Sequence, residues 1–75
     1  MHQRLHVVLK ISSYRLMEYY EGGVDSVVAM TTDGRTIKFP ANILRSVVQS
    51  YGVYGTFELV FDKNHKFVSI RRVSD

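Results

Sequence analysis

The chain has 75 residues, of which 45% are hydrophobic and 23% charged, a composition typical of a single small soluble domain spanning residues 1–75. It contains no cysteine, which excludes disulfide bridges, thiolate metal sites and thiol catalysis. Ten Lys and Arg residues against seven Asp and Glu residues give a net charge of +3, which permits an acidic partner without requiring one.

The chain begins with a pattern typical of a half-buried strand followed by a short helix. Apolar and polar residues alternate over residues 4–11, which predicts a strand. Ser12 and its neighbour then offer hydroxyls for capping, and apolar residues at helical spacing predict a helix over residues 14–21. Gly22 and Gly23 are expected to end this helix, because glycine adopts the left-handed conformation that closes one.

Residues 24–31 and 35–39 predict two strands joined by a tight turn. Asp33 and Gly34 lie between them, and Asp-Gly between two apolar-rich runs is one of the strongest short hairpin signals. Pro40 is expected to stop the second strand, because proline has no backbone N–H to donate. We therefore expect an antiparallel pair in this part of the chain.

The C-terminal half predicts a second short helix and a second hairpin. Apolar residues return to helical spacing over residues 41–49, with Asn42 as a candidate cap. Strands are predicted over residues 54–61 and 66–73, separated by a polar turn. So short a loop joins only adjacent antiparallel strands.

These elements predict an α+β fold in the order β-α-β-β-α-β-β. The two hairpins imply a five-stranded, mainly antiparallel sheet, either open and curled or closed into a small barrel, with two short helices packed against it. The pattern alone does not choose between the two forms. The side chains expected in the core are Leu5, Val7, Leu9, Leu16, Tyr20, Ile37, Phe39, Leu44, Val47, Phe57, Leu59 and Phe61.

Short residue motifs follow one another along the chain in a distinctive order. They are Tyr19-Tyr20-Glu21-Gly22, Asp33-Gly34-Arg35, Phe39-Pro40-Ala41, Leu44-Arg45, Gly52-Val53-Tyr54-Gly55-Thr56-Phe57, Phe61-Asp62 and Lys66-Phe67. In this order and spacing the chain resembles, over residues 5–72, a family of short bacterial proteins known as domain of unknown function 2835. The resemblance implies a stand-alone cytoplasmic bacterial protein. It implies no activity and supplies no functional residues.

No membrane-spanning segment is expected. The longest uninterrupted apolar run, residues 27–30, is far shorter than the roughly 20 residues that a membrane-spanning helix needs. His2 excludes N-myristoylation, and the lack of cysteine leaves no site for another lipid anchor. We therefore expect a soluble, cytoplasmic protein.

The sequence favours a protein that is not an enzyme and that binds no metal or organic cofactor. His2, His6 and His65 are expected to be exposed, and no serine stands in a nucleophile motif. Glu18 and Glu21 are neighbours on the predicted helix, yet no further ligand stands at metal-binding spacing. No catalytic, cofactor-binding or metal-binding residue is therefore predicted.

One functional hypothesis is the binding of single-stranded RNA or DNA. Basic residues are expected on outward strand faces, with tyrosines at a nearby turn whose rings can stack on bases. Outward lysines also have an ordinary role, since they block edge-to-edge aggregation of sheets. The candidate contacts are Lys10, Lys38, Lys66, Arg72, Tyr51 and Tyr54.

The favoured hypothesis is an interaction module that forms a homodimer. The strands predicted at 24–31 and 66–73 carry apolar residues on both faces, whereas two short helices can cover only one face of a sheet. A symmetric dimer would bury the other face on both subunits at once. The candidate interface residues are Val27, Val28, Val68, Ile70 and Tyr54, and nothing in the sequence identifies a different protein as partner.

Overall fold

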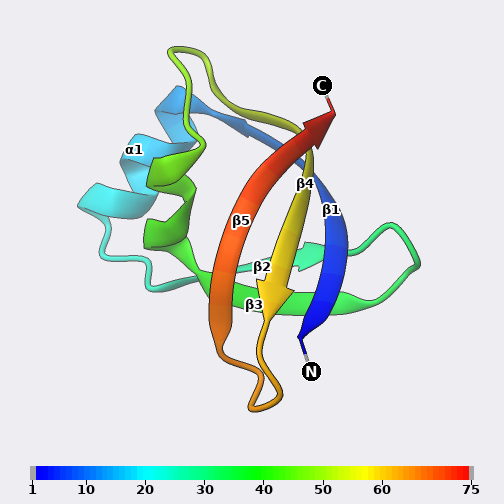
Figure 1. The fold of residues 1–75 in the computed structure, drawn as a ribbon. Helices are drawn as coiled ribbons and strands as arrows, with labels where there is room; N and C mark the ends of the chain where they lie inside the picture. Colours follow the sequence, from blue (N-terminus) through cyan, green and yellow to red (C-terminus); the bar gives the residue numbers. More distant parts are fainter. Residues whose placement is uncertain (1, 75) are drawn as a thin grey trace.

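The computed structural model describes residues 2–74 and confirms the α+β class and the predicted order of elements. Figure 1 shows the elements in chain order. They are β1 (Gln3–Ser12), α1 (Ser13–Glu21), β2 (Ser26–Met30), β3 (Thr36–Pro40), the 3₁₀ helix η1 (Ala41–Ser46), β4 (Gly52–Phe61) and β5 (Phe67–Ser74).

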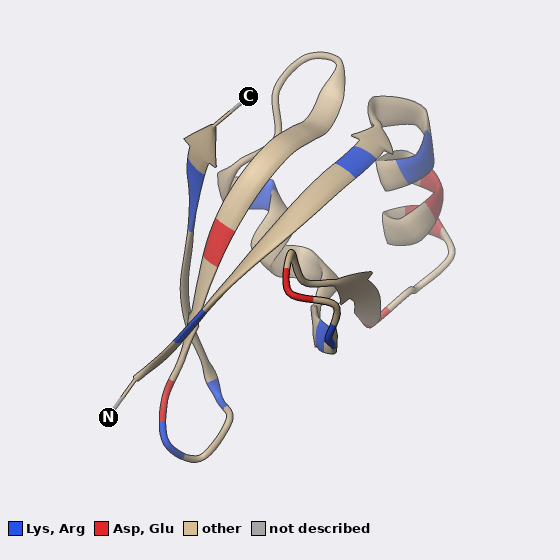
Figure 2. Ribbon diagram, turned by 90° about the vertical axis from the view of Figure 1, so that its right-hand side faces the viewer, with Lys and Arg blue, Asp and Glu red and all other residues tan. Residues whose placement is uncertain are grey.

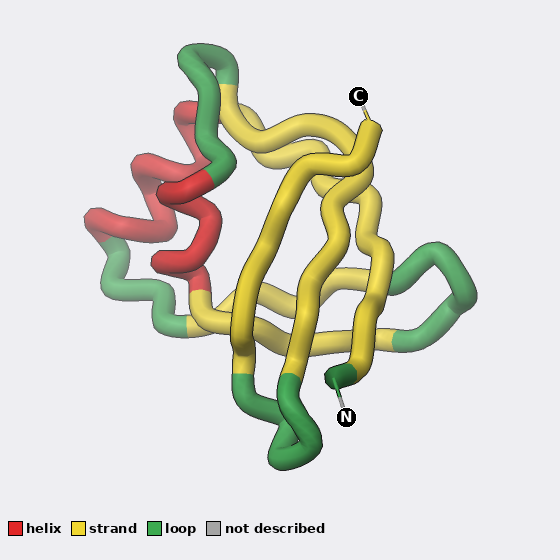
Figure 3. The backbone as a smooth tube through the Cα atoms, viewed as in Figure 1, coloured by secondary structure: helices red, strands yellow, loops and turns green. Residues whose placement is uncertain are grey.

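The strands form two antiparallel sheets, so the prediction of one five-stranded sheet or barrel is wrong in this respect. The larger sheet has the order β1-β4-β5, and β2 pairs only with β3. Between the sheets, the described residues show one strand pairing, Val7 with Thr31, next to a hydrogen bond from the Thr32 N–H to the His6 carbonyl at 2.8 Å. In Figures 1 and 3, β2 and β3 cross behind the three-stranded sheet.

The β2–β3 hairpin forms a second layer that covers part of the inner face of the three-stranded sheet. Neither α1 nor η1 is long enough to cover the inner face of the three-stranded sheet. The β2–β3 hairpin covers the rest, with Phe39 fully buried and Val27, Ala29 and Ile37 packed against the core. The β2–β3 hairpin therefore packs across the inner face of the three-stranded sheet instead of extending it.

The core lies between these layers, and most of its residues were predicted. Alternate residues of β1 face those of β4 in an unbroken register, such as Val7 opposite Phe57. Tyr20, Ile37 and Val47 are only half-buried. The central cluster comprises Leu5, Val7, Leu9, Ile11, Leu16, Phe39, Leu44, Val53, Phe57, Leu59 and Phe61.

The N-terminus of α1 is capped as predicted. The Ser12 hydroxyl accepts a hydrogen bond from the Arg15 N–H at 3.2 Å. Gly22 is the C-cap residue, and Gly23 follows in the left-handed conformation at φ 71°. The helix buries Leu16 against the core.

The predicted α-helix at 41–49 is wrong in type and length. The segment is a 3₁₀ helix, η1, and Pro40 rather than Asn42 precedes its first residue, without a side-chain cap. A 3₁₀ helix repeats every three residues, so Ala41 and Leu44 lie on one side and are both buried. One turn with this spacing is enough to bury both side chains.

Two bulges in β5 change the faces that its side chains occupy. The pairing of β4 with β5 shifts at two places, where Val68 and Val73 have no opposite residue. Each extra residue reverses the alternation beyond it. Ile70 and Arg72 therefore face inward, and Arg72 lies opposite the buried Phe57.

Candidate functional site

One face of the three-stranded sheet is covered by neither helix nor hairpin, and it is called the outer face below. Figure 1 views it directly, with α1 and η1 to one side and β2 and β3 behind. Its side chains come from alternate positions of β1 and β4 and from β5. They are Arg4, His6, Val8, Lys10, Tyr54, Thr56, Glu58, Val60, Ser69 and Arg71.

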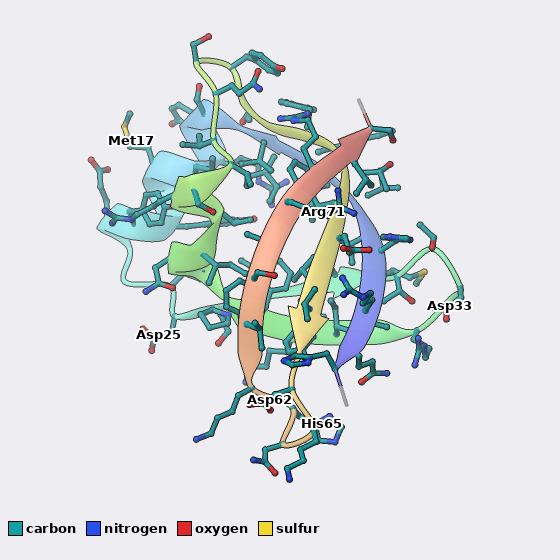
Figure 4. The ribbon with its side chains drawn as sticks, viewed as in Figure 1. Met17, Asp25, Asp33, Asp62, His65 and Arg71 are labelled. Carbon is teal, nitrogen blue, oxygen red and sulfur yellow. The ribbon has the colours of Figure 1, made fainter. Side chains whose placement is uncertain are left out.

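A buried carboxylate at the centre of the outer face gathers three basic side chains. Glu58 Oε1 accepts hydrogen bonds from Arg4 Nη1 at 3.2 Å and Arg71 Nε at 3.1 Å, and its Oε2 lies 3.2 Å from His6 Nε2. Glu58 belongs to the central strand, with Arg4 and His6 on β1 and Arg71 on β5. Figure 2 shows the acidic band of β4 between basic bands on its neighbours, and Figure 4 shows Arg71 on the open side of the sheet.

These contacts keep Glu58 ionised. Burial by itself raises the pKa of this carboxyl group, because it disfavours the charged form. Hydrogen bonds from Arg71 and His6, together with the charges of Arg71 and Arg4, outweigh burial and lower the pKa below its ordinary value of 4.5. At neutral pH the cluster therefore contains a carboxylate held between two guanidinium groups.

A second group on the outer face combines a lysine with two aromatic rings. Lys10 on β1 lies opposite Tyr54 on β4. The Tyr54 ring is stacked on that of Tyr51, with 5.7 Å between ring centroids and 29° between ring planes. Tyr51 is 52% exposed, so part of an aromatic surface beside Lys10 faces solvent.

The structure brings together only half of the residues predicted to contact nucleic acid. Lys10, Tyr51 and Tyr54 form the group just described. Lys38 lies on β3, in the other sheet, and Lys66 lies in the turn before β5.

Arg72 was expected to face outward, and this is wrong because the bulge at Val68 reverses the alternation of the residues that follow it. Its guanidinium carbon lies 5.0 Å from the centroid of the buried Phe57 ring, and its Nη1 donates a hydrogen bond to the Tyr54 carbonyl. Arg4 and Arg71 were not among the predicted contacts, although both are basic residues of the outer face. Arg4 could have been found from the alternation in the first strand, but Arg71 required knowledge of the bulge.

A groove of about 460 Å³ lies between β1 and β2, where the two sheets separate beyond the Val7–Thr31 pairing. Lys10 and Arg15 are the charged residues among those that line it. Three of its apolar side chains are at least half exposed, namely Val8 at 50%, Val28 at 64% and Met30 at 65%. Apolar surface from both sheets is therefore gathered at one place.

The residues predicted for a dimer interface lie on separate surfaces. Val27 and Val28 both line the groove between β1 and β2, and Val27 also packs against the core. Val68 and Ile70 line a different groove, between β5 and η1. Tyr54 belongs to the outer face. These five residues do not form one contact surface.

Neither a cluster of metal ligands nor a membrane-spanning helix is found among the described residues. Within residues 2–74, no three side chains of the His, Asp or Glu types are placed to share a metal ion. In the same range, no helix has the length and apolar character needed to cross a bilayer.

The comparisons with known proteins give one match. Neither a curated protein nor a solved structure shows significant similarity to the chain. A family model described as "Protein of unknown function (DUF2835)" matches residues 3–73, which is nearly the whole chain. This match confirms the resemblance found in the sequence motifs, and the chain belongs to the DUF2835 family.

Proposed function

We propose that the protein is a non-enzymatic interaction module that forms a symmetric dimer through the free edge of β2. The observation that carries this proposal is the exposure of Val28 and Met30 beside an unpaired strand edge. Clustered apolar side chains on a small domain mark a surface for association. The occupant of this surface is a second copy of the chain.

The backbone of β2 is suitably oriented for such pairing. The Thr32 N–H bonds to His6 on the β1 side, and the Thr31 N–H bonds to Arg35 on the β3 side. Successive residues of a strand direct their backbone N–H and C=O groups to opposite edges. Val28 and Met30, like Thr32, therefore direct theirs away from β3, toward the outer edge of β2. Val28 has no β1 residue opposite it in the strand pairing of the described residues.

A two-fold axis at Val28 would let the backbone N–H and C=O groups of this residue pair with those of its copy. Antiparallel pairing of β2 with its copy would place Val28 opposite its own counterpart, with two backbone hydrogen bonds across the axis. The result is a four-stranded sheet in the order β3-β2-β2-β3. The apolar side chains on the exposed side of β2 then lie against those of the other subunit.

Light scattering coupled to size-exclusion chromatography tests the proposal. The expected mass is near twice the chain mass of 8.7 kDa. Val28→Lys should return the mass to 8.7 kDa, because it places two like charges on the axis. Circular dichroism should show that the variant remains folded, since Val28 is exposed.

Val68→Lys is the matched control, since it adds the same charge to an exposed valine on the other sheet. This variant should remain dimeric. A monomeric parent protein would refute the proposal. A dimer broken by Val68→Lys but not by Val28→Lys would place the interface on β5 instead.

A further inference from the structure

The outer face carries a second binding surface, and we infer that it holds single-stranded nucleic acid. The inference does not rest on the dimer. The permanent cations Arg4, Lys10 and Arg71 share this face with one carboxylate, Glu58, which leaves a charge of +2. His6 adds positive charge when it is protonated. Phosphate groups are the matching ligand for such a face.

Glu58 positions Arg4 and Arg71 and leaves most of their N–H groups free to donate hydrogen bonds to a ligand. A guanidinium group has five N–H donors, and the bond from Arg4 or Arg71 to Glu58 uses one of them. Both arginine side chains are largely exposed, at 64% and 68%. The carboxylate therefore holds one nitrogen of each guanidinium group, and the exposed remaining donors can bind a phosphate.

The stacked pair of Tyr51 and Tyr54 supplies an aromatic surface, which attraction between charges alone does not provide. The half-exposed Tyr51 ring is stacked on Tyr54, which lies opposite Lys10 in the β1–β4 pairing. An unpaired base can stack on such a ring while the lysine contacts the adjoining phosphate. An acidic peptide would use the cations but would gain little from the stacked rings.

The shape of the face favours a single strand over a duplex. The site is the surface of a sheet, and Arg4 and Lys10 lie six positions apart on β1, about 20 Å along the strand. Stacking on Tyr51 requires a base that is not already stacked in a duplex. A short stretch of unpaired nucleotides can contact the cations and the rings together.

The test is fluorescence polarisation with labelled 12-nucleotide oligo(U) and oligo(dT) at two salt concentrations. We expect binding that weakens with salt. Lys10→Gln should reduce the slope of log affinity against log salt concentration by about 0.7, the value for one phosphate contact with a single strand. Tyr51→Ala should lower affinity at least about fivefold, because stacking on one base is lost.

Each variant has a matched control. Lys38→Gln removes the same charge from the other sheet and should change affinity less than twofold, while Tyr51→Phe keeps the ring and should retain binding. Both test residues are exposed, so the variants should melt like the parent and keep its mass in light scattering. Absence of binding at low salt would overturn the inference. Equal losses from Lys10→Gln and Lys38→Gln, or unchanged affinity in Tyr51→Ala, would reduce it to nonspecific attraction of a polyanion and likewise overturn it.

Discussion

The guanidinium group of Arg72 lies over the ring of Phe57, on the inner face of the three-stranded sheet, with 5.0 Å between the guanidinium carbon and the ring centroid. Phe57 is fully buried and lies on the central strand, opposite Val7 on one side and Arg72 on the other. Arg72 also donates to the Tyr54 carbonyl. This basic residue therefore helps to close the core and is not available to the outer face.

Arg72→Met should lower the free energy of unfolding by about 1–3 kcal/mol. The variant keeps an apolar stem over Phe57 but loses the cation–π contact and the charged hydrogen bond to the Tyr54 carbonyl. Urea unfolding at neutral pH measures the difference. Lys63→Met, in the exposed β4–β5 turn, is the control and should change stability by no more than about 0.5 kcal/mol. Equal stability of the two variants would contradict the role assigned to Arg72.

Phe57→Ala should cost about 3–5 kcal/mol, the usual loss when a fully buried phenylalanine is truncated. This is a large share of the stability of so small a domain, so a loss of the cooperative thermal transition is within expectation. Val73→Ala removes apolar atoms from an exposed bulge position and should leave the melting temperature nearly unchanged. A Phe57→Ala melting curve like that of the parent would show that the inner face has been misassigned.

Gly52→Ala should prevent folding or cost more than about 3 kcal/mol. Gly52 has φ 124°, and a Cβ atom there would lie 2.2 Å from the Ile11 carbonyl oxygen, which is backbone and cannot move aside. Gly34 is the useful comparison, because it has φ 89° but nothing within 4 Å of an added Cβ. Gly34→Ala should cost only the backbone strain, about 1–2 kcal/mol. Thermal melts of the two variants test this, and a similar loss in both would contradict the steric argument.

The local elements could be predicted from the sequence because their signals are local. The alternation over residues 4–11, the Ser12 cap and the Asp33-Gly34 turn each specify their structure within a few residues. The division into two sheets could not be read in this way. It depends on whether β2 pairs along β1 or packs across it, and the pattern of apolar residues is compatible with both.

The outer face was predictable only where the strands are regular. In β1, simple alternation places Lys10 and Arg4 on the outer face. In β5, the bulge at Val68 exchanges the expected faces of Arg71 and Arg72. No glycine stands there to mark the bulge in the sequence. In β4, simple alternation also places Glu58 outward, but its three basic neighbours come from two other strands, so their convergence depends on the strand order.

Glu58 should make the protein less stable in acid, and Glu58→Gln tests this. The pKa of Glu58 lies below its ordinary value of 4.5, so the folded state binds this proton less tightly than the unfolded state. The resulting stabilisation is complete above the unfolded-state value and is lost as the pH falls through the lower folded-state pKa. At neutral pH the variant should be less stable than the parent, since Arg4, His6 and Arg71 lose the carboxylate that holds them together.

The stability difference between parent and Glu58→Gln should therefore shrink as the pH is lowered from 7 to below 4.5, because a protonated Glu58 resembles glutamine. Asp33 and Asp62 also have lowered pKa values, through hydrogen bonds from Thr31 and Lys66 respectively, but they are present in both proteins and their effects cancel. Urea unfolding across this pH range gives the difference directly. Glu21→Gln, on the exposed surface of α1, should follow the parent at every pH. A constant difference between Glu58→Gln and the parent across the range would mean that Glu58 stabilises the sheet through packing alone and not through its charge.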